Sequence, residues 1–429
     1  MNIEEYFSQF FNGTKDPSLE AMNFFMNEFN NPHLKLNFIH VAGTNGKGSV
    51  TEMLSNVLID SGYRVGKFMS PHLIKYNERT SINNENISDV ELEEIIKELE
   101  LKIQAYNETH KVKVSLFEIE TTIAILYFYY KKVDIVIFEV GLGGLYDCTN
   151  IIEKPIASII NTISYDHMNI LGNSLEKIAS EKAGIIKENS NTIFCAQNDI
   201  VDEIVIEKCQ IKNNKLYMLD INDVQNYSYN KEYQKFDYKN YRDIKLNLKG
   251  PKQIKNAILC LQCFDILNEN NFEIKVENIK KGMMTVVHKA RFETLKIEPK
   301  IIFDGAHNDS AIKNFRETVN MYYKQDVKIY IISLLKTKDI NGFLKEILQE
   351  KNAKFIFTSG IDERFYTKEE LYESAINIIN ENNEVLEENM LQKLELIDSI
   401  NMCKKNLNKV IFFVGSFYIY KTVIEGLNS

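Results

Sequence analysis

A glycine-rich segment with a single lysine constrains the fold of this chain more than any other feature. It reads GTNGKGS at residues 43–49, directly after a short apolar run at 36–41 and directly before a segment with apolar residues at helical spacing. A strand, a glycine loop and a helix in this order can hold a polyphosphate, because backbone N–H groups close on phosphate oxygens while the helix N-terminus and the lysine supply positive charge. We therefore predict a polyphosphate site in an α/β fold.

This segment departs from the common GxxxxGK[ST] pattern of phosphate loops at two places. Val41 stands where that pattern has its first glycine, and Gly48 separates Lys47 from Ser49. The alternative is a tight turn with a solvated lysine, but the flanking strand and helix favour the phosphate loop.

Length and composition limit the class of protein. A chain of 429 residues exceeds what one hydrophobic core usually serves, so we expect two domains. The net charge of −9 argues against a nucleic-acid partner, although it allows a local basic pocket. Residues 1–20 are polar and acidic, and the longest apolar stretch, 122–130, is too short to span a bilayer. With six scattered cysteines, these features predict a cytoplasmic protein without a membrane partner.

Apolar strands alternate with amphipathic helices through the N-terminal part, as in a mostly parallel sheet covered on both faces. The predicted strands are 36–41, 64–69, 135–140, 156–160 and 192–195, and the predicted helices are 48–60, 89–106, 115–131 and 174–185. Residues 211–249 are polar and rich in Tyr and Asn, and their alternation favours a β-meander over a nucleic-acid surface. Helices at 252–267 and 276–283 follow.

The α/β rhythm begins again after Arg291. Strands are predicted at 300–303, 327–333, 355–358 and 410–414, with helices between them. We therefore place two domains at residues 1–291 and 292–429.

Polar side chains other than Lys47 follow strand ends in the first domain. Glu139 lies at the end of the strand at 135–140, Ser70 follows the strand at 64–69, and His167 follows that at 156–160. Ligands of open α/β sheets bind at this edge. A carboxylate beside a phosphate loop requires a cation, so we interpret Glu139 as a Mg²⁺ ligand rather than a surface acid, with His167 and Ser70 on the same edge. Lys182, near the end of a predicted helix, has only the features of an ordinary C-terminal turn.

The second domain has its own group at strand ends. Asp304 and His307 follow the strand at 300–303, Ser416 follows the strand at 410–414, and Arg291 lies at the domain boundary. Each is a weak signal alone, but their shared position at strand ends indicates a cleft.

A series of motifs runs through nearly the whole chain in a fixed order. They are HVAGTNGKGSV at 40–50, MSPHL at 69–73, SLFEIET at 115–121, FEVGLGG at 138–144, DCTN at 147–150, DH at 166–167, IASEKAGIIK at 178–187, FDGAHN at 303–308 and VGS at 414–416. This series resembles the Mur ligase superfamily, and within it the folylpolyglutamate synthase/dihydrofolate synthase family. The resemblance implies a P-loop, Mur ligase-like central domain with a mostly parallel sheet, and a smaller Rossmann-like α/β C-terminal domain.

The resemblance also implies an activity, that of an ATP-dependent amide ligase. Such an enzyme transfers the γ-phosphoryl group of ATP to a substrate carboxylate, and the amine of L-glutamate then attacks the acyl phosphate. The implied substrates are a folate or dihydropteroate, L-glutamate and ATP, the implied metal is Mg²⁺, and the implied oligomeric state is a monomer.

Residue roles follow from the same resemblance. The loop residues Gly43, Thr44, Asn45, Gly46, Lys47, Gly48 and Ser49 would bind the phosphates of ATP, with Lys47 on the β- and γ-phosphates. Ser70, Glu139 and His167 would hold Mg²⁺, and Lys182 matches the lysine that is carbamylated in this superfamily and binds a second Mg²⁺. Asn256 would face the adenine, Arg291 and Asp304 would reach the nucleotide, and His307 and Ser416 would lie near the nucleotide or glutamate. The candidate catalytic residues are then Lys47, Lys182, Arg291 and His307.

The chain departs from the family pattern at three places. Leu145 replaces an arginine, Lys252 replaces a histidine, and residues 288–290 read His-Lys-Ala in place of Trp-Pro-Gly. These changes concern folate specificity and the glutamate site more than the ATP machinery.

Two other functions remain open. One is a Mur-type ligase acting on a UDP-sugar carboxylate, against which the short segment before the phosphate loop argues. The other is a P-loop ATPase switch without ligation, which would not need Asp304, His307 or Ser416.

Overall fold

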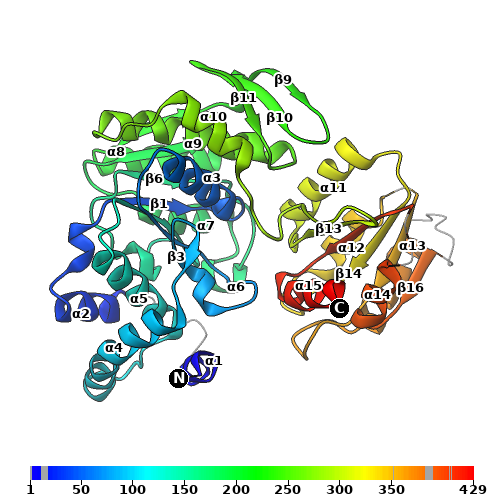
Figure 1. Cartoon of the computed structure of the whole chain (residues 1–429), viewed down its shortest axis with the longest axis horizontal. Helices are drawn as coiled ribbons and strands as arrows, with labels where there is room; N and C mark the ends of the chain where they lie inside the picture. Colours follow the sequence, from blue (N-terminus) through cyan, green and yellow to red (C-terminus); the bar gives the residue numbers. More distant parts are fainter. Residues whose placement is uncertain (1, 11–17, 351, 382–389, 405, 407) are drawn as a thin grey trace. The chain divides into compact units, whose positions relative to one another are not determined.

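The computed structural model describes residues 2–10, 18–350, 352–381, 390–404, 406 and 408–429. The chain folds into two compact units. Unit 1 comprises residues 1–229, 233–247 and 253–286, and unit 2 comprises 230–232, 248–252 and 287–429. Each unit is an α/β assembly of a sheet and flanking helices (Figure 1). The domain boundary after residue 291 stays a prediction.

Unit 1 is built on an eight-stranded sheet in the order β4-β3-β2-β5-β1-β6-β7-β8. Its strands are β1 (Phe38–Ala42), β2 (Val65–Phe68), β3 (Thr80–Ile82), β4 (Glu85–Asn86), β5 (Ile135–Glu139), β6 (Ala157–Ile160), β7 (Asn191–Cys195) and β8 (Lys215–Leu219). All neighbours pair in parallel except β2 with β3 and β3 with β4. The predicted mostly parallel sheet is confirmed.

Helices cover both faces of this sheet, because its central strands are apolar on both sides. The long helix α3 (Lys47–Asp60) contacts β1, β2 and β5 on one face, and α10 (Val276–Thr285) packs on it. The core of the other face contains Phe38, Phe68 and Phe138 of the sheet. The remaining helices of the unit are α1 (Ile3–Ser8), α2 (Glu20–Glu28), α4 (Asp89–Thr109), α5 (Leu116–Tyr130), α6 (Met168–Leu171), α7 (Leu175–Lys182), α8 (Asp199–Ile211) and α9 (Pro251–Glu269). No helix in the described residues has the length and apolarity needed to cross a membrane.

The polar region at 211–249 is only in part what its sequence predicts. Strands β9 (Gln225–Tyr229), β10 (Gln234–Tyr238) and β11 (Tyr241–Leu246) form an antiparallel meander, as expected. Strand β8 instead extends the main sheet in parallel with β7, which the sequence analysis did not predict. Being an edge strand, β8 is mostly exposed or half-buried and lacks the continuous apolar run of a central parallel strand.

Unit 2 contains a six-stranded sheet in the order β12-β13-β17-β14-β15-β16. Among the described residues of this sheet, only β12 is antiparallel to its neighbour. The strands are β12 (Glu293–Lys296), β13 (Lys300–Asp304), β14 (Lys328–Ile332), β15 (Ala353–Phe357), β16 (Leu391–Lys393) and β17 (Val410–Val414). The helices are α11 (Asp309–Tyr323), α12 (Ile340–Ile347), α13 (Lys368–Glu381), α14 (Leu396–Cys403) and α15 (Tyr420–Asn428).

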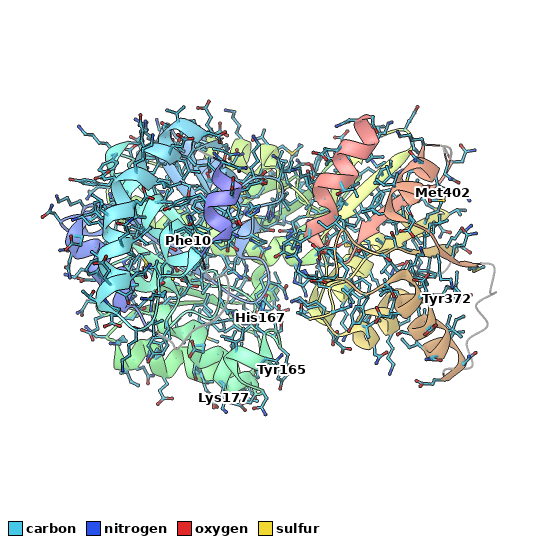
Figure 2. All side chains as sticks on the ribbon, turned by 90° about the horizontal axis from the view of Figure 1, so that it is seen from below. Phe10, Tyr165, His167, Lys177, Tyr372 and Met402 are labelled. Atoms are coloured by element: carbon cyan, nitrogen blue, oxygen red, sulfur yellow. The ribbon has the colours of Figure 1, made fainter. Side chains whose placement is uncertain are left out.

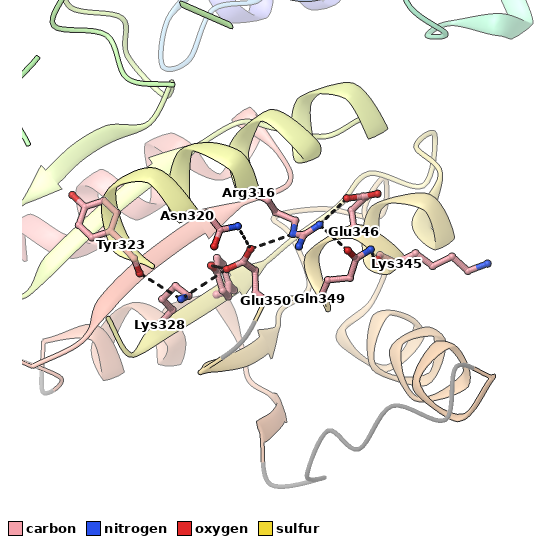
Figure 3. A network of polar contacts seen from close by, with 9 residues as sticks. Arg316, Asn320, Tyr323, Lys328, Lys345, Glu346, Gln349 and Glu350 are labelled. Atoms are coloured by element: carbon pink, nitrogen blue, oxygen red, sulfur yellow. Dashed lines mark hydrogen bonds and ion pairs between the residues drawn. The ribbon is translucent and has the colours of Figure 1, made fainter. Parts of the chain in front are cut away.

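A buried network of charges joins the helices of unit 2 to its sheet (Figure 3). The Glu350 carboxylate lies 3.2 Å from Arg316 Nε of α11 and 3.9 Å from Lys328 Nζ of β14, and it accepts a hydrogen bond from Tyr330 at 3.0 Å. Arg316 also lies 2.9 Å from Glu346 of α12. An unpaired buried charge destabilises a fold by about 3 to 5 kcal/mol, and here Arg316 and Lys328 keep the Glu350 carboxylate paired.

Candidate active site

The phosphate loop connects β1 to α3 and depends on two glycines. Gly43 has a φ of +149° and Gly46, at the start of α3, has a φ of +84°. A Cβ at Gly43 would lie 2.9 Å from Cβ of Asn161, and a Cβ at Gly46 would lie 2.7 Å from Oδ1 of Asn256. Backbone conformation and close packing both therefore exclude a side chain at these positions.

Residues that follow β6 anchor one side of this loop. Thr44 donates its backbone N–H to the carbonyl of Thr162 at 2.7 Å and its hydroxyl to the carbonyl of Ser164 at 3.0 Å. The two segments follow neighbouring parallel strands, so the loop lies at the carboxyl edge of the sheet.

A chain of amide side chains anchors the loop to α9. Asn161 donates to Asn256 Oδ1 at 2.7 Å, Asn256 donates to Gln253 Oε1 at 2.8 Å, and Gln253 donates to Ser49 Oγ at 3.3 Å. All four side chains are buried. The amide of Asn256 thus links Asn161 to Gln253 beside the loop. The contact of Asn256 with adenine stays a prediction.

Two lysines meet at one carbonyl of the loop. Lys47 Nζ donates to the Gly43 oxygen at 3.0 Å, and Lys182 Nζ, from the end of α7, donates to the same oxygen at 3.1 Å. Lys182 is 4 % exposed. Its burial, with the charge of Lys47, lowers the pKa of Lys182 to about 7, although carboxylates that include Asp166 and Asp147 oppose the shift.

The predicted Mg²⁺ ligands lie at or after the carboxyl ends of strands. Glu139 is the buried last residue of β5, and Ser70 follows β2. His167 is reached only after several residues beyond β6; its side chain is 47 % exposed, and Figure 2 shows it with Tyr165 at the surface of unit 1. Within the described residues, no three His, Cys, Asp or Glu side chains form a metal-binding group. Ser70 and phosphate oxygens would therefore have to complete a Mg²⁺ site with Glu139 and His167.

The carboxyl edge of unit 2 carries Asp304 at the end of β13. Its two oxygens accept the backbone N–H groups of Phe292 at 2.9 Å and Ala306 at 2.8 Å. Burial raises the pKa of Asp304, and the charge of Arg291 opposes that shift.

The ring of Phe417 contacts two other predicted residues of unit 2, and Ser416 precedes it in the chain. The Arg291 guanidinium lies 4.2 Å from the ring centroid, in a cation–π arrangement. The His307 ring lies 5.6 Å away, edge to face, and its Nδ1 donates to the Gly305 carbonyl at 2.7 Å. Ser416, directly before Phe417, is buried and accepts a hydrogen bond from the Tyr418 N–H at 3.3 Å.

Two residues that hold the phosphate loop, Asn161 and Gln253, had no predicted role. Asn161 could have been found, because it directly follows β6 at the edge where the loop lies. Gln253 is one of the residues that match the family pattern, but its place within a predicted helix gave no indication of a role at the loop.

Two family models match the chain. The Mur ligase middle domain matches residues 41–264, and the dihydrofolate synthetase C-terminal domain matches residues 288–426. The dihydrofolate synthase/folylpolyglutamate synthase of Bacillus subtilis (strain 168) is 32 % identical over 419 residues, which cover 96 % of this chain and 95 % of the relative. The chain belongs to the dihydrofolate synthase/folylpolyglutamate synthase family. It is therefore an enzyme of the ligase class, as the motifs predicted.

Solved structures of this family have the same fold. The folylpolyglutamate synthase of Thermotoga maritima is 28 % identical, with a TM-score of 0.85 over 100 % of this chain and 96 % of that one. The folylpolyglutamate synthase of Mycobacterium tuberculosis, complexed with ADP and AMPPCP, has a TM-score of 0.86 over 99 % of this chain and 96 % of that one. At 24 % identity, the second comparison concerns the fold alone. The predicted fold class is confirmed.

Proposed function

We propose that this ligase joins the amine of L-glutamate to the carboxylate of dihydropteroate, of a folate, or of both, with conversion of ATP to ADP and phosphate. The observation that carries the proposal is the convergence of Lys47 and Lys182 on the Gly43 carbonyl. It occurs in a chain that aligns over 96 % of its length with a dihydrofolate synthase/folylpolyglutamate synthase. The proposed partners are these small molecules alone, and the protein is proposed to be a cytoplasmic monomer.

The residues present fit a magnesium nucleotide. Gly43 and Gly46 allow the left-handed backbone of the loop, and the first turn of α3 offers N–H groups and the positive end of a helix dipole. Mg²⁺–ATP supplies the transferable phosphoryl group and neutralises part of its charge. Glu139, Ser70 and His167 are the proposed Mg²⁺ ligands: the carboxylate and hydroxyl oxygens suit this ion, and His167 is included on the family resemblance.

Lys47 and Lys182 have different proposed tasks. Lys47 binds the β- and γ-phosphates as a full positive charge that stabilises the transferring phosphoryl group. Lys182 is proposed to react with carbon dioxide, which forms a carbamate, releases one proton and provides a carboxylate for a second Mg²⁺. Only a neutral amine can react in this way, and a pKa of about 7 leaves a large fraction of Lys182 neutral near pH 7.

Residues of unit 2 are proposed to act on the nucleotide and on glutamate. Arg291 and Asp304 reach the nucleotide, while His307 and Ser416 lie near the nucleotide or the glutamate. The acceptor carboxylate attacks the γ-phosphorus, the bond from that phosphorus to the β,γ-bridging oxygen breaks, ADP leaves, and the carboxylate becomes an acyl phosphate. The glutamate amine then attacks the carbonyl carbon, the bond from that carbon to the phosphate oxygen breaks, and the products are an amide and inorganic phosphate. Asn256 is proposed to face the adenine on the resemblance alone.

An assay of ADP release with the purified protein tests this proposal. We expect release that requires L-glutamate together with dihydropteroate or a reduced folate, and a product lengthened by one glutamate in mass spectrometry. ADP release that ignores both pterin compounds would contradict the folate proposal and favour an ATPase switch or a ligase for another carboxylate.

A further inference from the structure

Three buried side chains, His40 of β1 and Asp147 and Thr149 after β5, form a chain of hydrogen bonds, which we call the relay. His40 of β1 lies with Nε2 2.8 Å from the Thr149 hydroxyl oxygen, and that hydroxyl donates to Asp147 Oδ1 at 2.5 Å. His40 and Thr149 are 0 % exposed, and Asp147 is 7 % exposed. Because the single hydroxyl proton of Thr149 goes to Asp147, His40 Nε2 must carry the proton of the first bond. Burial lowers the pKa of His40 to about 3, so the imidazole is neutral and its proton is on Nε2.

The far end of the relay shapes the glycine loop that follows β5. Asp147 Oδ2 accepts the backbone N–H of Leu142 at 2.8 Å, and Oδ1 also accepts the backbone N–H of Thr149 at 3.0 Å. The carboxylate therefore closes residues 142–147 into a compact turn. Asn150 fixes the same turn from the other side, because it donates to the Leu145 carbonyl at 2.8 Å.

This turn receives the end of α7, which carries Lys182. Leu145 donates its N–H to the Glu181 carbonyl at 2.9 Å. A Cβ at Gly144 would lie 2.6 Å from that carbonyl oxygen and 3.0 Å from Cα of Lys182, so the two backbones touch each other directly. The position of Lys182, and with it the reach of its amine to Gly43, depends on the shape of the turn.

We propose that His40 and Thr149 are positioning residues of the ligase: through Asp147 they hold the turn at 142–147, which seats residues 181 and 182 and places the Lys182 amine at the phosphate loop. The inference rests on the proposed function, in which Lys182 acts there. Asp147 has an electrostatic share in the same placement, since its negative charge acts on Lys182 and the charge of Lys47 acts on Asp147.

The test removes the central hydroxyl of the relay while keeping the volume of its side chain. In Thr149→Val, we expect kcat to fall about tenfold or more, with the KM for ATP within about twofold of its normal value, as is usual when a supporting hydrogen bond is lost. Thr149→Ser keeps the hydroxyl and should restore most of kcat. The matched control is Thr122→Val, because the buried Thr122 hydroxyl donates to the Glu118 carbonyl within α5, at 2.8 Å, and not to Asp147 or the turn at 142–147.

The first residue of the relay is tested in the same way. His40→Leu leaves Thr149 without a donor, and we expect a loss of kcat similar to that of Thr149→Val. His40→Gln can still present an N–H to Thr149 and should retain more activity. Equal losses in both His40 variants, or in Thr149→Val and Thr149→Ser, would overturn the inference.

A crystal structure of Thr149→Val gives a readout that does not depend on turnover. The distance from Lys182 Nζ to the Gly43 oxygen, 3.1 Å in the native chain, is expected to exceed hydrogen-bond range. An unchanged distance overturns the inference, even with an active native enzyme. A native enzyme that ignores pterin substrates would instead overturn the proposed function, and the crystallographic distance would still decide the inference.

Discussion

The two candidate edges, one in each unit, are held in place in different ways. In unit 1, segments far apart in the sequence hold the phosphate loop, since Lys182 bonds to Gly43 and Asn161 bonds to Asn256. In unit 2, the polar groups bond mostly to their own turns, and the ring of Phe417 gathers them. The first edge therefore depends on contacts between distant segments of its unit, and it contains the buried amine of Lys182. At the second edge, Asp304 and Ser416 are held by backbone hydrogen bonds, and Arg291 and His307 contact one aromatic ring.

Removal of the loop lysine should have the largest effect on the first edge. Lys47→Ala removes the full positive charge that stabilises the transferring phosphoryl group. We therefore expect ADP release to fall by about a thousandfold or more. Circular dichroism should be unchanged, because the glycines and the amide chain that shape the loop remain. Near-normal ADP release would mean that the loop does not bind phosphates as proposed.

Removal of the second lysine should have a smaller and repairable effect. Lys182→Ala is expected to lower turnover by about a hundredfold, and short carboxylic acids such as acetate should restore part of it, because they replace the carbamate oxygens. Lys177→Ala is the control, as Lys177 is an exposed lysine of the same helix. Two results together would contradict the carbamate: turnover that no carboxylic acid restores, and native crystals without density beyond the Lys182 amine. Lys182 would then have a structural role only.

Local sequence patterns predicted only part of the first edge and of the sheet that carries it. The phosphate loop was predicted from its own residues, because glycine, lysine and the flanking periodicity are local signals. The importance of Lys182 came only from the family resemblance, since its partner, Gly43, lies far away in the sequence. The bonds from Asn161 through Gln253 were not predictable, because they join β6 to α9 and require the tertiary fold. Strand β8 was missed for a related reason, in that an edge strand carries a weak apolar pattern.

Crowding the ring tests the second edge. A Cβ at Gly305 would run into the Phe417 ring, so Gly305→Ala should displace Phe417 and with it Arg291 and His307. We expect a loss of about 1 to 3 kcal/mol in the free energy of unfolding, from urea denaturation, and about tenfold in kcat/KM.

A double variant and a control variant test whether the loss in Gly305→Ala comes from contact with the Phe417 ring. Gly305→Ala combined with Phe417→Leu should recover stability, because the smaller side chain makes room. Gly426→Ala in α15 should be nearly neutral, since its Cβ would lie no closer than 3.1 Å to Ile400. Equal losses in Gly305→Ala and Gly426→Ala would mean that the ring does not organise this edge.

The last prediction concerns stability alone, namely the dependence of the unfolding free energy on pH near the first edge. The pKa of His40 is about 3 in the folded chain and about 6.5 when unfolded, so below pH 6.5 only the unfolded state binds this proton. His40 therefore contributes a loss of stability of about 1.4 kcal/mol per unit as the pH falls from 6.5 towards 3. His40→Gln should make the unfolding free energy less steep in this window by that amount. An unchanged slope would mean that His40 is not buried as a neutral group.

Transfer of an isotope from the acceptor tests the ligase reaction most directly. Dihydropteroate or a folate labelled with ¹⁸O in its carboxylate is incubated with the enzyme, ATP and L-glutamate, and the phosphate is examined by mass spectrometry. Activation of the carboxylate as an acyl phosphate predicts that each phosphate released with the new amide carries one labelled oxygen. Unlabelled phosphate, or phosphate formed equally well without the acceptor, would contradict it.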